Sequence, residues 1–343
     1  MSTLEERPMV VSSIPQDYTK RLMVFGGRAS MELAAKIANQ LDLDLGHVKL
    51  QTFSDGEVYC RYEESIRGAD VFLVQSTAAN EAHGLTPNDS LMELLLMIDA
   101  AQGASAHRII AVTPWYGYAR QDKKSAPREP ISARVVAKSL EAVGVDRVLA
   151  MDLHSGQVQG FFEVPVDHMT AMPMLTQWFM DQAFTEELVI VSPDAGRVKV
   201  ARNFARKIGT HWAVMEKERP AQQVAEIGYV VGDVTGKTAV LVDDMIDTAG
   251  TLCAAARTVL DEGAARVIAA ATHGVFSGPA YERLAYESSG IDRIVVTDTI
   301  PLRAGAPDNI TVLSTAQTLA DSIRRIFADD SVSEIFAGEN QLF

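Results

Sequence analysis

The segment Val240–Thr251 (VLVDDMIDTAGT) combines residue types that suit a sugar phosphate. An apolar strand ends in Asp243 and Asp244, and residues 248–251 then open a helix. Backbone N–H groups at a helix start, together with threonine hydroxyls, form a concave site for a phosphate group. The two carboxylates just before it could bind two sugar hydroxyls or a metal ion. The plainer alternative is an acidic strand end followed by an ordinary helix cap.

A second group of polar residues follows the apolar stretch Arg147–Met151. Asp152 and His154 come directly after it, at the carboxyl end of a predicted parallel strand, where open α/β sheets bind their ligands. Carboxylate oxygens with a single histidine suit Mg²⁺, which keeps several waters and bridges substrate phosphates. The lack of a nearby cysteine disfavours a zinc site. The alternative is a capped loop in which His154 is only hydrogen-bonded.

Positive charge follows the aromatic stretch Trp115–Tyr118. Arg120, Lys123 and Lys124 suit the oxygens of a polyphosphate, because a guanidinium binds two oxygens at once and an ammonium adds a point charge. The aromatic rings before them could pack on a base. Taken alone, the segment could equally be a solvated loop.

The tripeptide Gly236–Thr238 (GKT) has the sequence that ends a phosphate-binding P-loop. The first glycine that such a loop requires is replaced by Val231, and the tripeptide precedes a strand instead of following one into a helix. We therefore expect a hairpin turn at this place.

Short apolar runs alternate with longer amphipathic patterns, which indicates that parallel strands and helices position these residues. The rhythm runs once through the first half of the chain and then restarts, so we predict two successive α/β units, each a doubly wound sheet. The predicted strands are Leu22–Phe25, Val71–Val74, His107–Thr113, Arg147–Met151, Leu188–Val191, His211–Met215, Thr238–Val242, Arg266–Ala271 and Ile291–Val296. The predicted helices are Met31–Leu41 with Ser30 as its N-cap, Asp89–Ala101, Pro130–Val143, Val198–Ile208 and Thr251–Glu262.

Composition limits the class of protein. The chain has 343 residues, 47% of them hydrophobic and 22% charged, which is typical of a folded protein of about two domains. A net charge of −14 argues against nonspecific binding to nucleic acid or to anionic lipid, and no apolar run approaches the roughly 20 residues of a membrane span. With only Cys60 and Cys253, a disulfide framework is not expected, which favours a reducing, cytoplasmic location.

The domain organisation follows from the restart of the pattern near Pro165 and Pro173. We expect a polar extension over residues 1–20, a first domain over residues 21–170 and a second domain over residues 171–343. The first would carry the predicted polyphosphate and Mg²⁺ segments and the second the predicted sugar-phosphate segment.

Taken together, the polar segments resemble those of the ribose-phosphate pyrophosphokinase family, phosphate-regulated class. They occur in family order from about residue 22 to the C-terminus, which makes the resemblance specific. The matching segments are Phe53–Glu57 (FSDGE), Glu64–Arg67 (ESIR), Tyr118–Lys124 (YARQDKK), Arg128–Ala133 (REPISA), Asp152–His154 (DLH), Gln159–Phe162 (QGFF), Ser192–Asp194 (SPD) and Val242–Thr251 (VDDMIDTAGT).

The resemblance implies two phosphoribosyltransferase-like domains with mainly parallel sheets. It implies transfer of the diphosphate group of ATP to the 1-hydroxyl of ribose 5-phosphate, which gives 5-phospho-ribose 1-diphosphate and AMP. It also implies Mg²⁺ as the cofactor, inorganic phosphate and ADP as effectors, and a homo-oligomer between a dimer and the hexamer of the family.

The resemblance also assigns roles to individual residues. ATP would be bound by Arg120, Gln121 and His154, with Phe53, Asp55, Gly56 and Glu57 reaching the adenine from the adjacent subunit. Mg²⁺ would be held by Asp152, His154 and Asp194. Ribose 5-phosphate would be bound by Asp243 and Asp244 through its hydroxyls and by Asp247, Thr248, Ala249, Gly250 and Thr251 through its phosphate.

Two further sites carry over from the family. Lys217 and Arg219 match the Lys-x-Arg pair of the catalytic loop, where cations would neutralise charge on the phosphates. The regulatory anion site between subunits would use Ser65, Arg67, Ser331, Ser333 and Phe336. There the alternative is that Ser65 and Arg67 simply end a strand.

The chain departs from the family pattern at several positions. Arg197 stands where the family usually has a second glycine after Ser192–Asp194, and it would either crowd that turn or add a phosphate contact. The stretch Ala78–Asn88 is several residues longer than usual. Glu218 replaces the middle arginine of the catalytic loop, Glu163 replaces an aspartate, and Ala249 replaces a glycine of the phosphate loop.

Two other classes share part of this pattern. A non-catalytic regulatory paralogue would not need Lys217, Arg219 and His154 together with an intact phosphate loop. A true phosphoribosyltransferase shares the Asp-Asp and Thr-x-Gly-Thr pattern, but it needs neither the ATP motifs of the first half nor two such domains. Both are weaker interpretations than a ribose-phosphate pyrophosphokinase.

Overall fold

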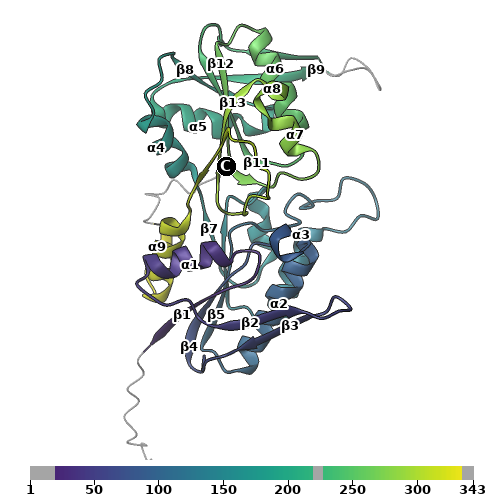
Figure 1. The fold of residues 1–343 in the computed structure, drawn as a ribbon, viewed down its shortest axis with the longest axis vertical. Coiled ribbons are helices and arrows are strands. Elements are labelled where there is room, and N and C mark those ends of the chain that lie inside the picture. Colours follow the sequence, from purple (N-terminus) through teal and green to yellow (C-terminus); the bar gives the residue numbers. More distant parts are fainter. Residues whose placement is uncertain (1–19, 219–226, 334–343) are drawn as a thin grey trace, which may run out of the picture.

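The computed structural model describes residues 20–218 and 227–333. Two sheets form the two halves of this part of the chain, the first half in purple and blue and the second in green (Figure 1). The predicted α/β class with mainly parallel sheets is confirmed. No helix of the described residues is long and apolar enough to cross a bilayer.

The first sheet has five strands in the order β1-β4-β5-β6-β7, and all its strand pairs are parallel. Every residue of β4 is buried, and almost every residue of β5 and β6, because helices cover both faces of a parallel sheet. The strands are β1 (Arg21–Gly26), β4 (Ala69–Val74), β5 (Arg108–Thr113), β6 (Arg147–Met151) and β7 (Val166–Met169).

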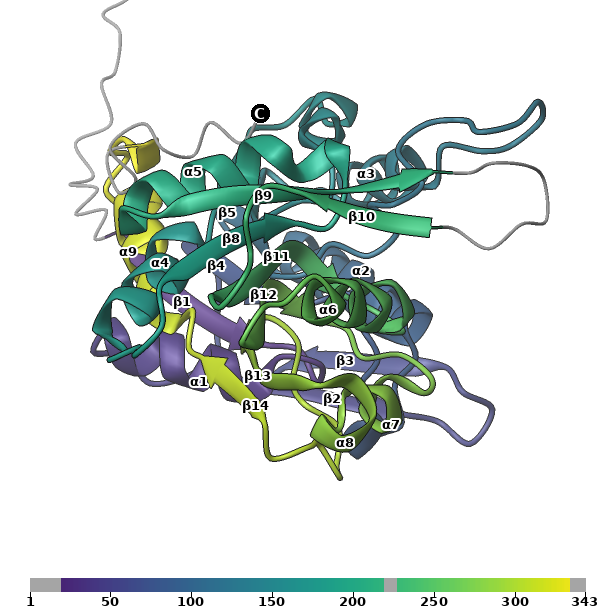
Figure 2. The same ribbon diagram turned by 90° about the horizontal axis from the view of Figure 1, so that it is seen from above.

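The second sheet has seven strands in the order β10-β9-β8-β11-β12-β13-β14, of which only the β9–β10 pair is antiparallel (Figure 2). Gly236 forms a turn of positive φ before β11, but β10 and β11 are not neighbours in the sheet, so the predicted hairpin there is wrong. The strands are β8 (Leu188–Ser192), β9 (His211–Glu218), β10 (Ile227–Val231), β11 (Thr238–Ile246), β12 (Arg266–Gly274), β13 (Ile291–Thr297) and β14 (Ile310–Leu313).

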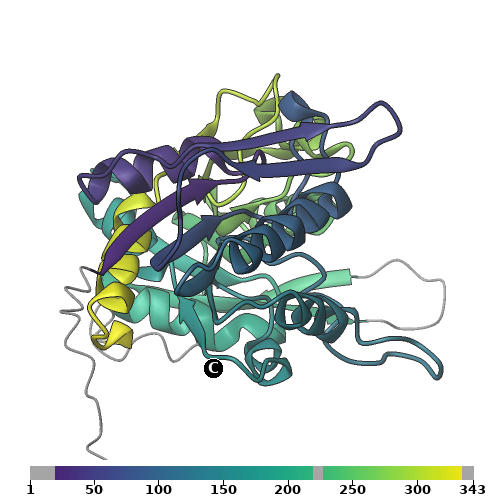
Figure 3. The ribbon, with the colours of Figure 1, turned by 90° about the horizontal axis from the view of Figure 1, so that it is seen from below.

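A two-stranded hairpin, β2 (Val48–Thr52) and β3 (Val58–Tyr62), projects from the first half (Figures 1 and 3). It packs against helix α2 (Pro87–Gly103), and the hydroxyl of Tyr62 donates a 2.8 Å hydrogen bond to the carbonyl of Met97. Sequence analysis predicted no strands here, because the residues of this hairpin are intermediate or exposed and show no apolar run.

Helices cover both sheets, and α9 returns from the second half to pack against α1 of the first (Figure 1). Ser30 precedes α1 as predicted, but its hydroxyl accepts the backbone N–H of Ser76 at 2.8 Å instead of capping the helix. Besides α2, the helices are α1 (Met31–Gln40), α3 (Ser132–Ala142), α4 (Met172–Asp181), α5 (Val198–Ile208), α6 (Gly250–Asp261), α7 (Ala280–Leu284), α8 (Tyr286–Ser289) and α9 (Ala316–Phe327).

The two halves meet along buried polar contacts at the carboxyl ends of β6 and β12. The hydroxyl of Thr272 donates to the Asp152 carboxylate at 2.6 Å, and the backbone N–H of Ala171 donates to the same oxygen at 2.8 Å. Nε2 of His273 lies 3.1 Å from the carbonyl of Met151. These contacts, with a hydrophobic core that includes residues of both sheets, fix the halves against each other. The division into domains at residue 170 stays a prediction.

The longer stretch Ala78–Asn88 also joins the two halves. It forms a short 3₁₀ turn at Glu81–His83, closed by the backbone pair of Asn80 and Leu85. Glu81 forms a 3.1 Å ion pair with Arg303 of the second half. Next to it Ala78 packs with Trp115 and Ile300, so the longer segment forms part of the contact between the halves.

We expect Thr272→Val to destabilise the protein by about 1–3 kcal/mol, because it leaves a buried carboxylate short of one donor. Urea denaturation measures the change, and Thr235→Val, at an exposed turn, serves as the matched control with little effect. Equal stabilities of the two variants would show that the Asp152–Thr272 contact contributes nothing to the packing of the halves.

Candidate active site

Three segments bring polar side chains together where the two halves meet. His154 follows β6 of the first sheet, while Asp243 and Asp244 lie within the last part of β11 in the second sheet. Arg197 lies at the end of the short 3₁₀ helix Ala195–Arg197, directly before α5. The sequence assigned His154 and the two acids to different sites and gave Arg197 no site, and the structure places all four in direct contact.

His154 is held by one carboxylate of the second sheet. Its Nδ1 lies 2.6 Å from Oδ2 of Asp244. At this distance from a carboxylate oxygen, Nδ1 must carry the ring proton, so the lone pair of the neutral ring is on Nε2. A histidine oriented in this way by a carboxylate is the usual arrangement for a ring nitrogen that binds a metal ion or accepts a hydrogen bond from a ligand.

Arg197 contacts both acids and the histidine. Its Nη2 lies 2.7 Å from Oδ1 of Asp244, and its Nε lies 3.6 Å from Oδ1 of Asp243. Nη2 also lies 3.2 Å from Nδ1 of His154 and donates to the His154 carbonyl at 3.4 Å. Nη2 of Arg197 and the protonated Nδ1 of His154 are both donors, so the 3.2 Å between them is not a hydrogen bond. Both atoms instead donate to the Asp244 carboxylate.

The two acids differ in their electrostatics. Burial raises the pKa of Asp243 above its ordinary value, and the neighbouring Asp244 carboxylate raises it further. Burial also acts to raise the pKa of Asp244, but the hydrogen bond from His154 and the charge of Arg197 outweigh it and hold that pKa below its ordinary value. Asp244 is therefore the ionised member of the pair, and Asp243 loses its own proton most readily when a further cation is present.

Asp194 lies beside this cluster and is exposed. Its Oδ1 accepts the backbone N–H of Arg197 at 3.1 Å, so it caps the 3₁₀ helix that carries the arginine. Asp152, in contrast, is buried and directs one carboxylate oxygen to Thr272 and the backbone of Ala171. Of the predicted metal ligands, His154 and Asp194 are thus the accessible ones, and Asp152 supports the strand end behind them.

The predicted phosphate loop lies at the start of α6. Ala249 precedes the helix with φ of +59°, a left-handed conformation that glycine adopts more easily. Nη1 of Arg283 donates to the carbonyl of Thr248 at 2.9 Å and holds the loop from outside. Nη1 of Arg120 forms a 2.6 Å ion pair with Asp247, so a predicted ATP ligand contacts the predicted sugar-phosphate loop.

A cavity of about 570 Å³ lies next to Arg120 and Gln121. Trp115, Phe276 and Ile300 provide apolar lining from both halves. The longer segment also takes part, through residues at both of its ends. This volume adjoins the candidate nucleotide residues and has room for a base-sized group.

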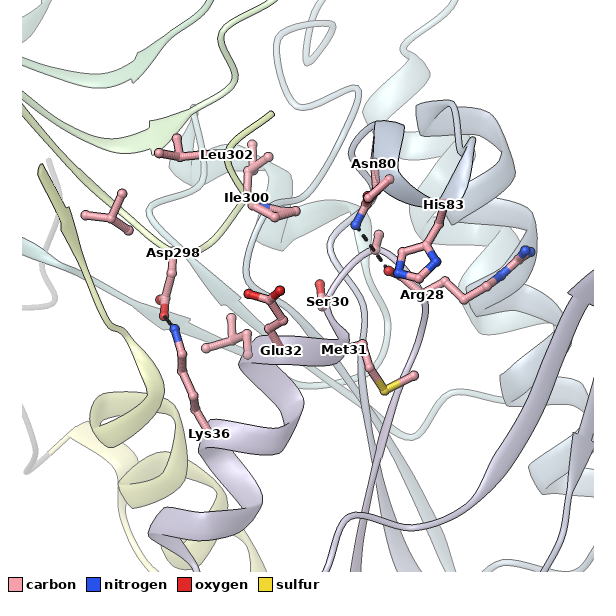
Figure 4. Close-up of a pocket in the computed structure, with 15 residues that line it drawn as sticks. Arg28, Ser30, Met31, Glu32, Lys36, Asn80, His83, Asp298, Ile300 and Leu302 are labelled. Atoms are coloured by element: carbon pink, nitrogen blue, oxygen red, sulfur yellow. Dashed lines mark hydrogen bonds and ion pairs between the residues drawn. The ribbon is translucent and has the colours of Figure 1, made fainter. Parts of the chain in front are cut away.

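A second cavity, of about 330 Å³, opens at the start of α1 (Figure 4). Figure 4 shows Glu32, Lys36 and Asp298 along one side and Asn80 and His83 along the other, with Lys36 paired to Asp298 at 3.1 Å. None of the residues predicted to bind substrate lines it, so we do not include it in the candidate site.

The residues predicted to meet the adenine lie on the β2–β3 hairpin. Phe53 is 47% exposed at the turn of the β2–β3 hairpin, and Asp55, Gly56 and Glu57 are exposed beside it. These residues line neither cavity, as expected if they serve an adjacent subunit. Lys217 belongs to β9, opposite Gly228 of β10, and Arg219 lies outside the described residues.

Ser65, Arg67 and a residue close to Ser331 contact the start of β1 or the residue before it. Arg21 donates to the carbonyls of Ser65 at 2.9 Å and Arg67 at 3.4 Å. Lys20, the residue before it, forms a 2.8 Å ion pair with Asp329, two residues before Ser331. Ser65, Arg67, Ser331 and Ser333 are exposed at this edge, and Phe336 lies outside the described residues.

Among the residues that the structure describes, no three His, Cys, Asp or Glu side chains gather into a metal site. Mg²⁺ is usually bound by one or two protein ligands together with substrate phosphates and waters, and not by a complete protein cage. His154, with its lone pair on Nε2, and the exposed Asp194 fit such a shared site. Sequence analysis missed the contact of Arg120 with Asp247 and the role of Arg283, because both depend on the packing of the chain.

Comparison with known proteins decides the family. The N-terminal domain of ribose phosphate pyrophosphokinase matches residues 22–144, and the phosphoribosyl synthetase-associated domain matches residues 215–337. The chain belongs to the ribose-phosphate pyrophosphokinase family. The family, the fold class and the enzyme class predicted from the sequence are therefore confirmed.

Individual relatives cover nearly the whole chain. The ribose-phosphate pyrophosphokinase of Caldanaerobacter subterraneus subsp. tengcongensis is 50% identical over 320 residues, 93% of this chain and 99% of its own. That of Chromobacterium violaceum is 49% identical over 321 residues, 93% of this chain and 95% of its own. The crystal structure of phosphoribosylpyrophosphate synthetase from Mycobacterium smegmatis matches with a TM-score of 0.83 and 46% identity, covering 90% of this chain and 100% of that one.

His168 gives this pyrophosphokinase a pH-dependent stability beside the site. Its Nε2 accepts the backbone N–H of Leu153 at 2.8 Å, and burial lowers the pKa of His168 to about 4. In the unfolded chain the His168 ring binds a proton with a pKa of about 6.5. The free energy of unfolding that the neutral ring contributes above this pH is therefore lost as the pH falls toward 4, by up to about 3 kcal/mol.

We expect His168→Gln to reduce the loss of stability between pH 7 and pH 5, measured by urea denaturation at each pH. The matched control is His83→Gln, at an exposed position, which should leave the pH dependence unchanged. An unchanged slope in His168→Gln would show that His168 does not stay neutral in the folded protein.

Proposed function

We propose that this protein transfers the diphosphate group of ATP to the 1-hydroxyl of ribose 5-phosphate, giving 5-phospho-ribose 1-diphosphate and AMP. One observation supports this function in addition to the family: residues predicted to bind ATP form hydrogen bonds with residues predicted to bind the sugar phosphate. His154 pairs with Asp244, and Arg120 pairs with Asp247. Reaction between two substrates requires that their binding residues adjoin, and these pairs make them adjoin within one chain.

The proposed site divides its work among the segments. The start of α6 and the threonines of residues 248–251 bind the 5-phosphate, and Asp243 and Asp244 bind the sugar hydroxyls. The oxygen of the 1-hydroxyl forms a bond to the β-phosphorus of ATP. The bond from that phosphorus to the oxygen that joins it to the α-phosphorus breaks, and AMP leaves with this oxygen. The hydroxyl proton is released, and no residue is assigned as its acceptor.

Cations complete the proposed site. His154 and Asp194 would hold Mg²⁺, which supplies positive charge to the phosphates when bound. Lys217 and Arg219 would add charge on the transferred group, with Phe53, Asp55, Gly56 and Glu57 of an adjacent subunit at the adenine. Because an adjacent subunit would complete the adenine site, we propose a homo-oligomer. We also propose a cytoplasmic location and two domains that divide near residue 170.

The proposed reaction is tested by incubating the protein with ATP, ribose 5-phosphate and Mg²⁺ and separating the nucleotides by chromatography. We expect AMP and 5-phospho-ribose 1-diphosphate in equal amounts, and neither product in excess chelator, because Arg197 is already paired with Asp244 and the phosphates of ATP need a metal ion to neutralise their charge. A regulatory paralogue would form neither product under any condition. Full activity in chelator would contradict the metal requirement but not the reaction.

We expect Lys217→Ala to lower kcat by about 10²–10³-fold with a smaller change in KM, because a cation that engages the transferring phosphoryl group acts mainly in the transition state. Steady-state kinetics with both substrates measures the split. Lys199→Ala, an exposed lysine on α5, is the matched control and should behave as the wild type. A rise in KM alone would make Lys217 a binding residue only.

We propose that inorganic phosphate activates the enzyme and ADP inhibits it at the exposed edge that includes Ser65 and Arg67, because a guanidinium binds phosphate oxygens in pairs. Arg67→Ala should then flatten the dependence of activity on phosphate concentration, whereas Arg61→Ala, an exposed arginine of β3, should leave it unchanged. Superimposable phosphate curves for the wild type and Arg67→Ala would place the regulatory site elsewhere.

A further inference from the structure

Arg197 is the residue that connects the proposed sugar and nucleotide sites. Its side chain contacts Asp243, Asp244 and His154, and its backbone N–H is bonded to Asp194. The side chain is only 14% exposed, so the guanidinium is enclosed by the groups that it contacts. A glycine at this position could make none of these side-chain contacts.

The contacts of Arg197 make the two acids unequal. Asp244 is 8% exposed, with one oxygen on Arg197 and the other on His154, so its orientation is fixed from both sides. Asp243 is 36% exposed and lies farther from the guanidinium, at 3.6 Å. Asp243 is thus the more accessible of the two acids, while the carboxylate of Asp244 is held in place between Arg197 and His154.

We propose that Arg197 is a positioning residue for both substrates of this enzyme: it fixes Asp244 and, through Asp244, the ring of His154. The inference rests on the proposed function, since it assigns the sugar to Asp243 and Asp244 and the nucleotide to His154. Loss of the guanidinium frees the Asp244 carboxylate to turn and leaves the His154 ring with one support fewer. Either substrate must then order these side chains when it binds, and this cost weakens its binding.

The geometry requires a guanidinium and not merely a positive charge. Nη2 and Nε reach two different carboxylates, while Nη2 also reaches the His154 carbonyl. A lysine has one nitrogen at the end of a flexible chain and can follow only one of these directions at a time. Arg197→Lys should therefore recover only part of what Arg197→Ala loses.

The experiment compares Arg197→Ala, Arg197→Lys and Arg197→Gln with the wild type, with Lys199→Ala on α5 as the exposed control. Steady-state kinetics gives KM for each substrate, calorimetry gives the Kd of ribose 5-phosphate alone, and thermal unfolding shows which variants are folded. We expect Arg197→Ala to raise KM for both ATP and ribose 5-phosphate by about tenfold or more, with Arg197→Lys in between. If Arg197→Ala does not fold, Arg197→Gln provides the same comparison.

A double variant tests whether Arg197 acts through Asp244. In the Asp244→Asn background, Arg197→Ala should add much less than it does in the wild type, because the shared contact is already lost. Unchanged KM values in a folded Arg197→Ala overturn the proposal, and so does a tighter Kd for ribose 5-phosphate, which would make Arg197 a competitor of the sugar. Failure of the wild type to form AMP would instead contradict the proposed function.

Discussion

The buried carboxylate of Asp152 fixes the relative position of the two halves, on which the candidate site depends. It accepts hydrogen bonds from Thr272 of the second sheet and from the backbone of Ala171, and Asp152 itself has φ of +37°, a conformation that an L-residue rarely adopts without support. That conformation turns the chain at the end of β6. His154, two residues further on, is thereby brought to the acids of the other sheet.

Charge balance is the second constraint, and it follows from the first. Bringing His154 to the end of β11 places its ring against two adjacent acids, and burial and the neighbouring carboxylate disfavour the ionisation of Asp243. Arg197 supplies positive charge from the second half itself and, with His154, keeps Asp244 ionised, while Asp243 ionises most readily when a further cation is present.

The sequence predicted the central parallel strands because buried strands form continuous apolar runs, as in β4, β5 and β11, but it missed the four-residue parallel edge strands β7 and β14, which are less buried. The β2–β3 hairpin has no such run, and it was missed. The chemistry of Asp243, Asp244 and His154 could be predicted from residue type and order, but their pairing could not, since it depends on how two sheets pack. Ser30 shows the same limit, because its predicted capping bond is replaced by a contact with Ser76 across the sheet.

Placing the site between two sheets makes its geometry depend on packing and not on loop conformation. Arg120 reaches Asp247 and His154 reaches Asp244 across this boundary, so each substrate would contact residues of both halves. The longer segment adds a further link through Glu81 and Arg303, on the side of the larger cavity. A shift of one sheet against the other would separate both pairs at once, and an error of about 1 Å in such alignment can cost about 10²-fold in rate. If these pairs hold the two substrates as proposed, the contacts between the halves serve catalysis as well as stability.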